Sequence, residues 1–196
     1  TFFDVELSDT TGQDRAITLV YCMPVSRTDL RWLRDPRRQE VVASPREYCE
    51  TLHRPSVGAN GQLSQYPLGA VSNDTAGTAL GIDMRRPAFF RIGYNAGSQE
   101  LYIAYDLGLT PEKPSARVRF CRYAFDPQWG FRAALAQYRA LFPESFRVRA
   151  KRQGLWMPFA KISAVKDWQD FGFQCKEGDG ETKWDDQHEI ITFRYT

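Results

Sequence analysis

Residues 126–159 constrain the fold of this chain more than any other stretch, because they change from helical to extended character. Asp126 offers a side-chain oxygen that can cap a helix, and Pro127 suits the first helical position. A helix is then predicted by apolar side chains that recur at i, i+4, i+7 and i+11, namely Phe131, Leu135, Tyr138 and Phe142. Pro143 cannot continue a helix, so we expect the helix to end there and to bury its apolar stripe.

The chain beyond this helix has a different character. Residues 147–152 are basic, and residues 154–159 form an apolar run that is too short for a helix and is typical of a buried strand. We therefore expect an all-β domain at 1–125, a connector helix and linker at 126–150, and a second domain at 151–196. The chain stops directly after a strand-like run, so we interpret the second domain as truncated.

The first 125 residues carry the pattern of short strands joined by turns. Strands are predicted by runs rich in β-forming residues at 2–7, 15–25, 63–72, 77–84, 87–94, 100–107 and 115–125. Residues 26–63 are polar and interrupted by proline and glycine, and we expect a long excursion with one short helix at 45–52. About seven or eight strands with short connections favour antiparallel pairing, and a β-sandwich is the natural arrangement. The predicted fold class is mainly β.

Composition excludes some partners. The formal net charge is only +2, and basic side chains are spread among acidic ones, so we expect no nucleic-acid partner. No apolar run approaches the roughly 20 residues of a membrane span, so we expect no membrane partner. The 4 cysteines contain no C-x-x-C pair and are interpreted as buried free thiols, although one disulfide stays open. The chain begins without Met, so a removed leader, and with it a secreted or periplasmic location, also stays open.

A family resemblance lies in residues 105–195. The segments that carry it are YDLGLTPEKP, FDPQWGFRAALAQYRALFPESF, QGLWMPFAKIS, DFGF, KEG, WDD and ITFRYT. Together they resemble large bacterial glycoside-hydrolase-type proteins, in which a β-sandwich precedes a (β/α)8 barrel. The resemblance implies that GLWMPF is the first barrel strand and ITFRYT the second, so that residues 151–196 are the start of a (β/α)8 barrel. It also implies that the chain is part of a carbohydrate-active enzyme and that the substrate is a carbohydrate.

The same resemblance limits what this chain does alone. A complete barrel needs eight strands and about 250 residues. Glycoside hydrolysis needs two carboxylates at a controlled separation, and no such pair is identified here, so the catalytic residues stay unknown. We expect them beyond this chain, which makes the remainder of its own polypeptide a partner and leaves the 196-residue chain inactive by itself. No cofactor and no metal ion is expected.

Candidate substrate-binding residues follow from the expected barrel. Active sites of barrels gather at the C-terminal ends of strands, and Lys161 and Arg194 follow the two expected strands. Both side chains suit sugar hydroxyls or a sugar carboxylate, and so does Asp170. Trp168 and Trp184, like Trp156, offer an indole face that packs against a pyranose ring. The alternatives are core aromatic residues and surface salt bridges.

An acidic run precedes the last strand, and it consists of Glu177, Asp179, Glu181, Asp185, Asp186 and Glu189. Such a run can hold Ca²⁺, but its spacing does not fit an EF-hand, and a solvated loop is the favoured interpretation. Asp185 and Asp186 could serve as an acid and a base, but adjacent residues on extended backbone point opposite ways. Near the start of the chain, Trp32 lies among four arginines, Arg31, Arg34, Arg37 and Arg38. They could form a basic-aromatic patch, but we favour a solvated loop.

Two other functions remain open, and both depend on the sandwich domain and not on a barrel. The chain could be a non-catalytic carbohydrate-binding module, or it could be a structural β-sandwich module. The barrel interpretation requires residues 154–159 and 189–195 to be parallel neighbours, which would bring Lys161 and Arg194 to one rim.

Overall fold

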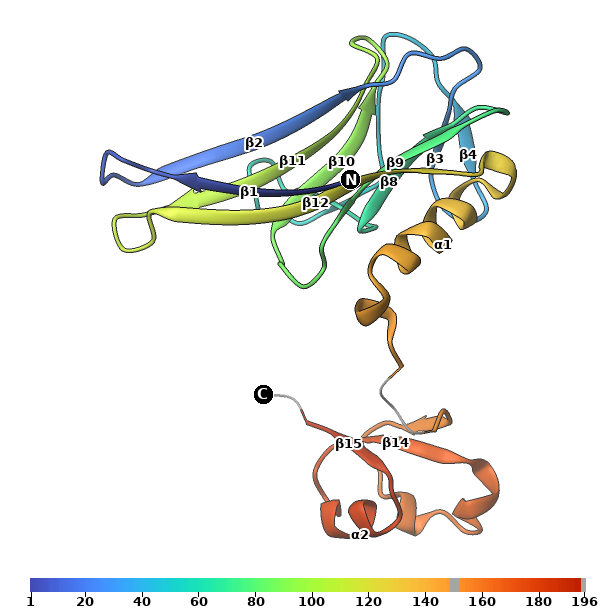
Figure 1. Ribbon diagram of the computed structural model, residues 1–196. Helices are drawn as coiled ribbons and strands as arrows, with labels where there is room; N and C mark the ends of the chain where they lie inside the picture. Colours follow the sequence, from blue (N-terminus) through green and yellow to red (C-terminus); the bar gives the residue numbers. More distant parts are fainter. Residues whose placement is uncertain (149–151, 195–196) are drawn as a thin grey trace. The chain divides into compact units, whose positions relative to one another are not determined.

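The computed structural model describes residues 1–148 and 152–194. The chain divides into two compact units, unit 1 at Thr1–Phe146 and unit 2 at Arg147–Thr196 (Figure 1). The helix that was predicted as a connector packs within unit 1. Part of the predicted basic linker, residues 149–151, and the last two residues, 195–196, lie outside the described residues.

Unit 1 contains two antiparallel sheets, which confirms the mainly β prediction and is consistent with a sandwich. The first sheet has the strand order β1 (Phe2–Ser8), β12 (Ser115–Phe125), β9 (Gly77–Ile82), β8 (Leu68–Ser72), β3 (Arg31–Leu33) and β4 (Gln39–Val41). The second sheet has the order β2 (Arg15–Pro24), β11 (Glu100–Leu109), β10 (Phe89–Asn95) and β5 (Glu47–Cys49). A separate hairpin consists of β6 (Thr51–His53) and β7 (Gln62–Ser64).

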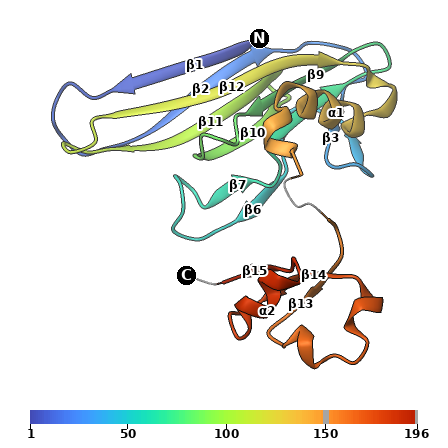
Figure 2. The same ribbon diagram turned by 60° about the horizontal axis from the view of Figure 1, so that its bottom comes forward.

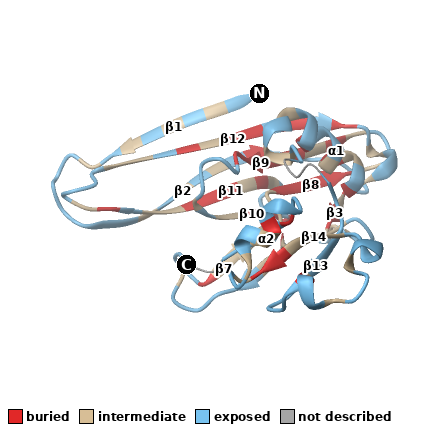
Figure 3. Cartoon of the chain, turned by 90° about the horizontal axis from the view of Figure 1, so that it is seen from below, coloured by how far each residue is buried: buried red, intermediate tan, exposed pale blue. Residues whose placement is uncertain are grey.

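One apolar core includes side chains of both sheets. Phe120 of β12 stacks on Phe3 of β1, with 4.9 Å between ring centroids, and Leu101 and Ile103 of β11 are fully buried in the same cluster. Edge strand β1 alternates between exposed and half-buried residues, whereas all of β8 is buried (Figure 3). Burial on both faces of β8 requires a second layer of side chains over the first sheet.

Helix α1 (Phe131–Leu141) supplies that layer. It packs against β8, β9 and β12, on the side of the first sheet away from the second sheet (Figure 2). Its buried contacts include Ala70, Ala79 and Cys121 of the three strands beneath it. Tyr138 is fully buried, and its hydroxyl donates to the carbonyl oxygen of Ile82 at 2.6 Å.

The predicted apolar stripe of the helix is largely correct. Phe131, Tyr138 and Phe142 are buried, but Leu135 is only partly buried, because Ala134 occupies the centre of the contact at 0% exposure. A small residue there lets the helix backbone approach the sheet.

The start and end of the helix differ from the prediction. Asp126 caps a separate 3-10 turn, η1 (Pro127–Trp129), by accepting a hydrogen bond from the backbone N–H of Gln128 at 2.9 Å. Gly130 then adopts φ 50° and ψ −128°, a conformation that favours glycine, and α1 begins after it. Beyond the helix, η2 (Pro143–Phe146) completes unit 1.

The secondary structure predicted for residues 26–63, a long polar excursion with one short helix, is wrong. These residues provide the short strands β3 to β6, and the start of β7, in place of one helix at 45–52. The reason is that a few apolar side chains among the polar ones join the core: Trp32, Leu33 and Tyr48 are 2%, 2% and 3% exposed. Sequence periodicity over such three-residue strands is too short to recognise.

Unit 2 has a parallel sheet of three strands in the order β13 (Leu155–Met157), β14 (Phe173–Glu177) and β15 (Ile191–Phe193). The first connection contains two 3-10 turns, η3 (Ile162–Ala164) and η4 (Trp168–Phe171), and the second contains helix α2 (Thr182–Gln187). The predicted direct pairing of 154–159 with 189–195 is therefore wrong, because β14 lies between these strands and pairs with both. The ITFRYT segment provides the third strand, not the second.

We expect Phe131→Ala to lower the free energy of unfolding of unit 1 by about 3–5 kcal/mol, because it opens a cavity between α1 and the sheet. Gln137→Ala is the matched control on the exposed face of the helix and should change the free energy by less than about 0.5 kcal/mol. Denaturant unfolding measures both. A loss for Phe131→Ala no larger than that of the control would contradict the packing described.

Candidate functional site

The two faces of the parallel sheet in unit 2 have different chemistry. The register pairs Trp156 with Cys175, and Glu177 with Phe193, so these four side chains share one face. Lys176 points to the opposite face, where it contacts α2. Trp156 and Phe193 are 55% and 52% exposed, which leaves one face of the sheet largely uncovered by the described residues.

An open pocket of about 390 Å³ lies on the uncovered face, toward the C-terminal ends of the strands. Its lining consists of Trp156, Cys175, Glu177, Phe193 and Arg194. These residues combine aromatic surface, one carboxylate and one guanidinium in a single depression. Aromatic surface with a few convergent polar groups is the usual composition of a small-molecule site.

Glu177 is the most unusual group of the pocket. It is the last residue of β14, and it is 3% exposed. Both of its carboxylate oxygens are buried, and neither has a hydrogen-bond partner among the described residues. A buried polar group without a partner costs about 1–3 kcal/mol, and more when it is charged. Such a group in a pocket calls for a partner that enters from outside.

The loop after β14 brings two of the predicted site residues to the same edge. Arg194 follows β15, and its Nε lies 3.4 Å from Oδ2 of Asp179. Lys161 follows β13, and its Cε lies 3.9 Å from the place that a Cβ would occupy on Gly180. Lys161 therefore lies near Gly180, and Arg194 pairs with Asp179, at the C-terminal edge of the sheet.

The other predicted site residues lie elsewhere. Trp168 in η4 and Trp184 in α2 pack against each other at 4.9 Å between ring centroids, and Trp184 stacks on His188 at 4.1 Å. Neither indole lines the pocket. Asp170 is exposed in η4, which precedes β14 and so lies toward the N-terminal end of that strand. Of the five predicted site residues, Arg194 lines the pocket, whereas Lys161, Trp168, Asp170 and Trp184 do not.

The acidic run is only partly a loop, because α2 begins within it. Asp185 and Asp186 lie in this helix and not on extended backbone, and Asp185 is 0% exposed whereas Asp186 is exposed. Asp185 is occupied by a cation, so it does not form an acid–base pair with its neighbour. No group of metal-ligating side chains is present among the residues that the structure describes.

That cation is Lys176, which anchors α2 to the covered face of the sheet. Its amine lies 2.8 Å from Oδ2 of Asp185 and 3.2 Å from Oε1 of Glu181, and Thr192 also donates to Asp185 at 3.0 Å. Burial by itself lowers the pKa of Lys176, but the two carboxylates outweigh burial and raise it. Ser163 donates to Glu181 and fixes the other end of this network.

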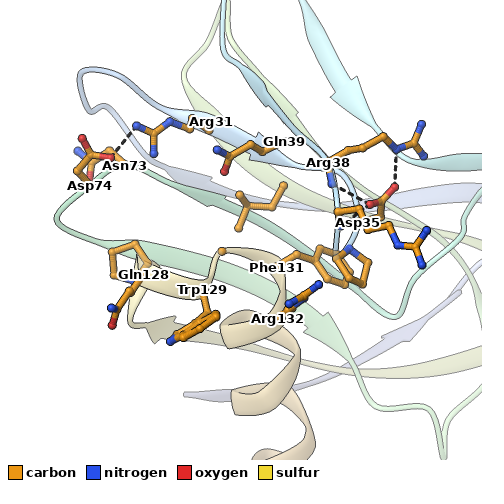
Figure 4. Close-up of a pocket in the computed structure, with 15 residues that line it drawn as sticks. Arg31, Asp35, Arg38, Gln39, Asn73, Asp74, Gln128, Trp129, Phe131 and Arg132 are labelled. Atoms are coloured by element: carbon orange, nitrogen blue, oxygen red, sulfur yellow. Dashed lines mark hydrogen bonds and ion pairs between the residues drawn. The ribbon is translucent and has the colours of Figure 1, made fainter.

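Unit 1 contains a second polar depression, of about 410 Å³, between the β3–β4 hairpin and the start of α1 (Figure 4). The sequence favoured a solvated loop over a basic-aromatic patch around Trp32, but Trp32 is only 2% exposed and belongs to the core. Trp129 of η1 takes its place at the surface with 65% exposure. Arg34 is also excluded from this depression, because it forms a salt bridge with Glu50 at 2.6 Å.

The sequence did not predict that Trp156 and Glu177 lie together in the unit 2 pocket. Trp156 was considered as a sugar platform, but a core position in its strand was favoured, and Glu177 was counted with the acidic run. Alternation in residues 173–177 was the available signal, because it places Phe173, Cys175 and Glu177 on one face.

The four cysteines are free, and burial raises the pKa of Cys49 to about 11 and of Cys121 to about 12. Cys22 is exposed, contrary to the prediction.

We expect neighbouring substitutions on β14 to have opposite effects on the stability of unit 2. Lys176→Met leaves Asp185 buried without its cation and should lower the free energy of unfolding by about 3–5 kcal/mol. Glu177→Met removes an unpartnered buried carboxylate and should raise it by about 1–3 kcal/mol. Hydrogen exchange of the β14 amides measures the change in unit 2 alone. A destabilised Glu177→Met protein would contradict the absence of a partner for Glu177.

In the parts of the chain that the structure describes, no helix has the length and apolar character needed to cross a membrane. No family model, curated protein or solved structure matches this chain. The resemblance to glycoside-hydrolase-type proteins therefore stays a prediction from residue patterns. Function has to be inferred from the side chains of the pocket and of the depression in unit 1.

Proposed function

We propose that this chain is part of a carbohydrate-active enzyme of the glycoside-hydrolase type. In this proposal unit 2 is the start of a (β/α)8 barrel, and a sugar binds at the C-terminal ends of its strands. The observation that carries the proposal is the buried, unpartnered carboxylate of Glu177 between Trp156 and Arg194 in an open pocket.

The arrangement of unit 2 supports a barrel. Its strands are parallel and follow one another in chain order, and helical segments connect them. The Lys176–Asp185 ion pair holds α2 on one face, which corresponds to the outer face of a barrel. Trp156 and Phe193 remain exposed on the other face, which corresponds to the barrel interior. Further strands of the same polypeptide would then cover these aromatic side chains.

The pocket side chains suit a sugar. An indole such as that of Trp156 packs on the apolar face of a pyranose, and a guanidinium such as that of Arg194 donates to hydroxyl or carboxylate oxygens. Glu177 would accept a hydrogen bond from a sugar hydroxyl or act as the acid or base. Its position at the C-terminal end of a parallel strand is where barrel enzymes place catalytic groups.

A second carboxylate is required for hydrolysis. It would face Glu177 at about 5–5.5 Å in a retaining enzyme, or at about 6.5–9.5 Å in an inverting one. Asp179 is a poor choice, because it is largely exposed and pairs with Arg194. We therefore place the second carboxylate in the remainder of the polypeptide, which keeps the expectation that the 196-residue chain alone has no hydrolase activity.

The decisive experiment uses the natural polypeptide that contains these residues and a panel of aryl glycosides. We expect turnover of at least one glycoside, and Glu177→Gln should lower kcat by a factor of about 10²–10⁴, the usual contribution of a general acid or base. Asp186→Asn is the matched control, since Asp186 is an exposed carboxylate on α2 outside the pocket.

The outcomes test the proposed activity and the proposed role of Glu177 separately. An absence of turnover with every glycoside would refute the proposed activity. Turnover that survives Glu177→Gln unchanged would leave the activity in place and remove Glu177 from the mechanism. Equal losses in Glu177→Gln and Asp186→Asn would point to a general structural effect and would also reject a chemical role for Glu177.

A further inference from the structure

We propose that the depression between the β3–β4 hairpin and the start of α1, here called the arginine cleft, binds an acidic oligosaccharide. Its ligand is a sugar chain that carries carboxylate or sulfate groups. The site belongs wholly to unit 1 and does not rest on the proposed barrel or on Glu177. It would give the sandwich a binding role of its own.

The arginine cleft has two polar sides (Figure 4). Arg31, Arg38 and Gln39 lie along the β3–β4 hairpin, and Gln128, Trp129 and Arg132 lie along the opposite side. Leu33 and Phe131 belong to the lining and to the core cluster under α1, where they are 2% and 5% exposed. The lining therefore rests on the packed core and not on a free loop.

The cleft has an excess of positive charge. Four arginines line it, Arg31, Arg37, Arg38 and Arg132, together with two aspartates, Asp35 and Asp74. The aspartates are engaged: Asp74 pairs with Arg31 at 2.6 Å, and Asp35 pairs with Arg38 at 2.7 Å. Within the described chain neither Arg37 nor Arg132 forms a salt bridge, so two guanidinium groups are available for an anionic ligand.

The backbone that presents these groups is fixed before a ligand arrives. Oδ1 of Asp35 accepts hydrogen bonds from the backbone N–H of Arg37 at 2.7 Å and of Arg38 at 2.9 Å. Asp126 fixes the η1 turn that carries Trp129. Little ordering of the main chain would therefore be needed for binding, which favours affinity.

An acidic sugar fits this chemistry better than a nucleic acid. The exposed indole of Trp129 offers a flat apolar platform, and the amides of Gln39 and Gln128 can donate to and accept from hydroxyl groups. Arg37 and Arg132 can each form charge-assisted hydrogen bonds to a carboxylate or sulfate. A nucleic-acid site requires a longer basic track, and this chain has a net charge of only +2.

Isothermal titration calorimetry of the 196-residue protein tests the proposal with four probes. They are an oligogalacturonate, which carries carboxylates alone, a chondroitin sulfate oligosaccharide, which carries sulfates as well as carboxylates, a neutral malto-oligosaccharide and a single-stranded DNA oligonucleotide. We expect binding of at least one acidic sugar, weakening as salt is added because the contacts are ionic. The neutral sugar and the DNA should bind at least roughly tenfold more weakly.

Single substitutions locate the binding. Arg37→Gln, Arg132→Gln and Trp129→Ala should each weaken the acidic sugar roughly tenfold, the effect of losing one charge-assisted hydrogen bond or one stacking contact. Arg122→Gln on β12 and Phe89→Ala on β10 are matched controls on exposed residues outside the cleft, and should leave the affinity unchanged. Circular dichroism and thermal unfolding confirm that each variant is folded.

Several results would overturn the proposal. One is a failure of both acidic sugars to bind at low salt. Others are equal or tighter binding of the neutral sugar or the DNA, and equal weakening by the control substitutions. Loss of glycoside turnover in Glu177→Gln has no bearing on this site, because Glu177 lies in unit 2.

Discussion

The sandwich depends on the burial of its first sheet from both sides. Core side chains of the second sheet meet one face, and α1 covers the other. The close approach of α1 requires Gly81, where a Cβ would lie only 2.8 Å from the ring of Tyr138. Tyr138 then satisfies its buried hydroxyl with the carbonyl oxygen of Ile82. The helix start, and with it one side of the arginine cleft, is held in place by this packing.

In unit 2, the two faces of the sheet differ in whether a buried charged side chain has a partner. On one face of its sheet, the charge of Lys176 is balanced by Asp185 and Glu181, and the network joins strand and helix. On the other face, the adjacent Glu177 is buried with no partner among the described residues. Oδ1 of Asp185 also has no hydrogen-bond partner, but its other oxygen pairs with Lys176 and Thr192, whereas neither oxygen of Glu177 has a partner. A buried charged group that lacks any partner is expected where a ligand binds. The difference between these two neighbours is the main physical basis for placing a site on the open face.

Sequence reasoning succeeded where a pattern was long. The alternation of the long strands and the helical stripe around Phe131 and Tyr138 predicted a mainly β chain with one packed helix. It failed where elements were short. The strand at 173–177 contains Gln174, Lys176 and Glu177, and its polar composition resembles a loop. Lys176 is buried because it pairs with carboxylates of the following segment, Glu181 and Asp185. Likewise, Trp32 and Trp129 look equivalent in sequence, yet one is in the core and the other at the surface.

The sequence by itself determined the elements whose periodicity is set by local geometry: the antiparallel strands, the helix after Gly130 and the change of character beyond it. Only the tertiary structure decided which charged residues meet. It paired Lys176 with Asp185, left Glu177 without a partner, and brought Arg37 and Arg132 to one cleft across nearly a hundred residues of chain. The physical reason is that backbone periodicity is a property of one element, whereas the partner of a buried or clustered charge is decided by packing between different elements of the chain.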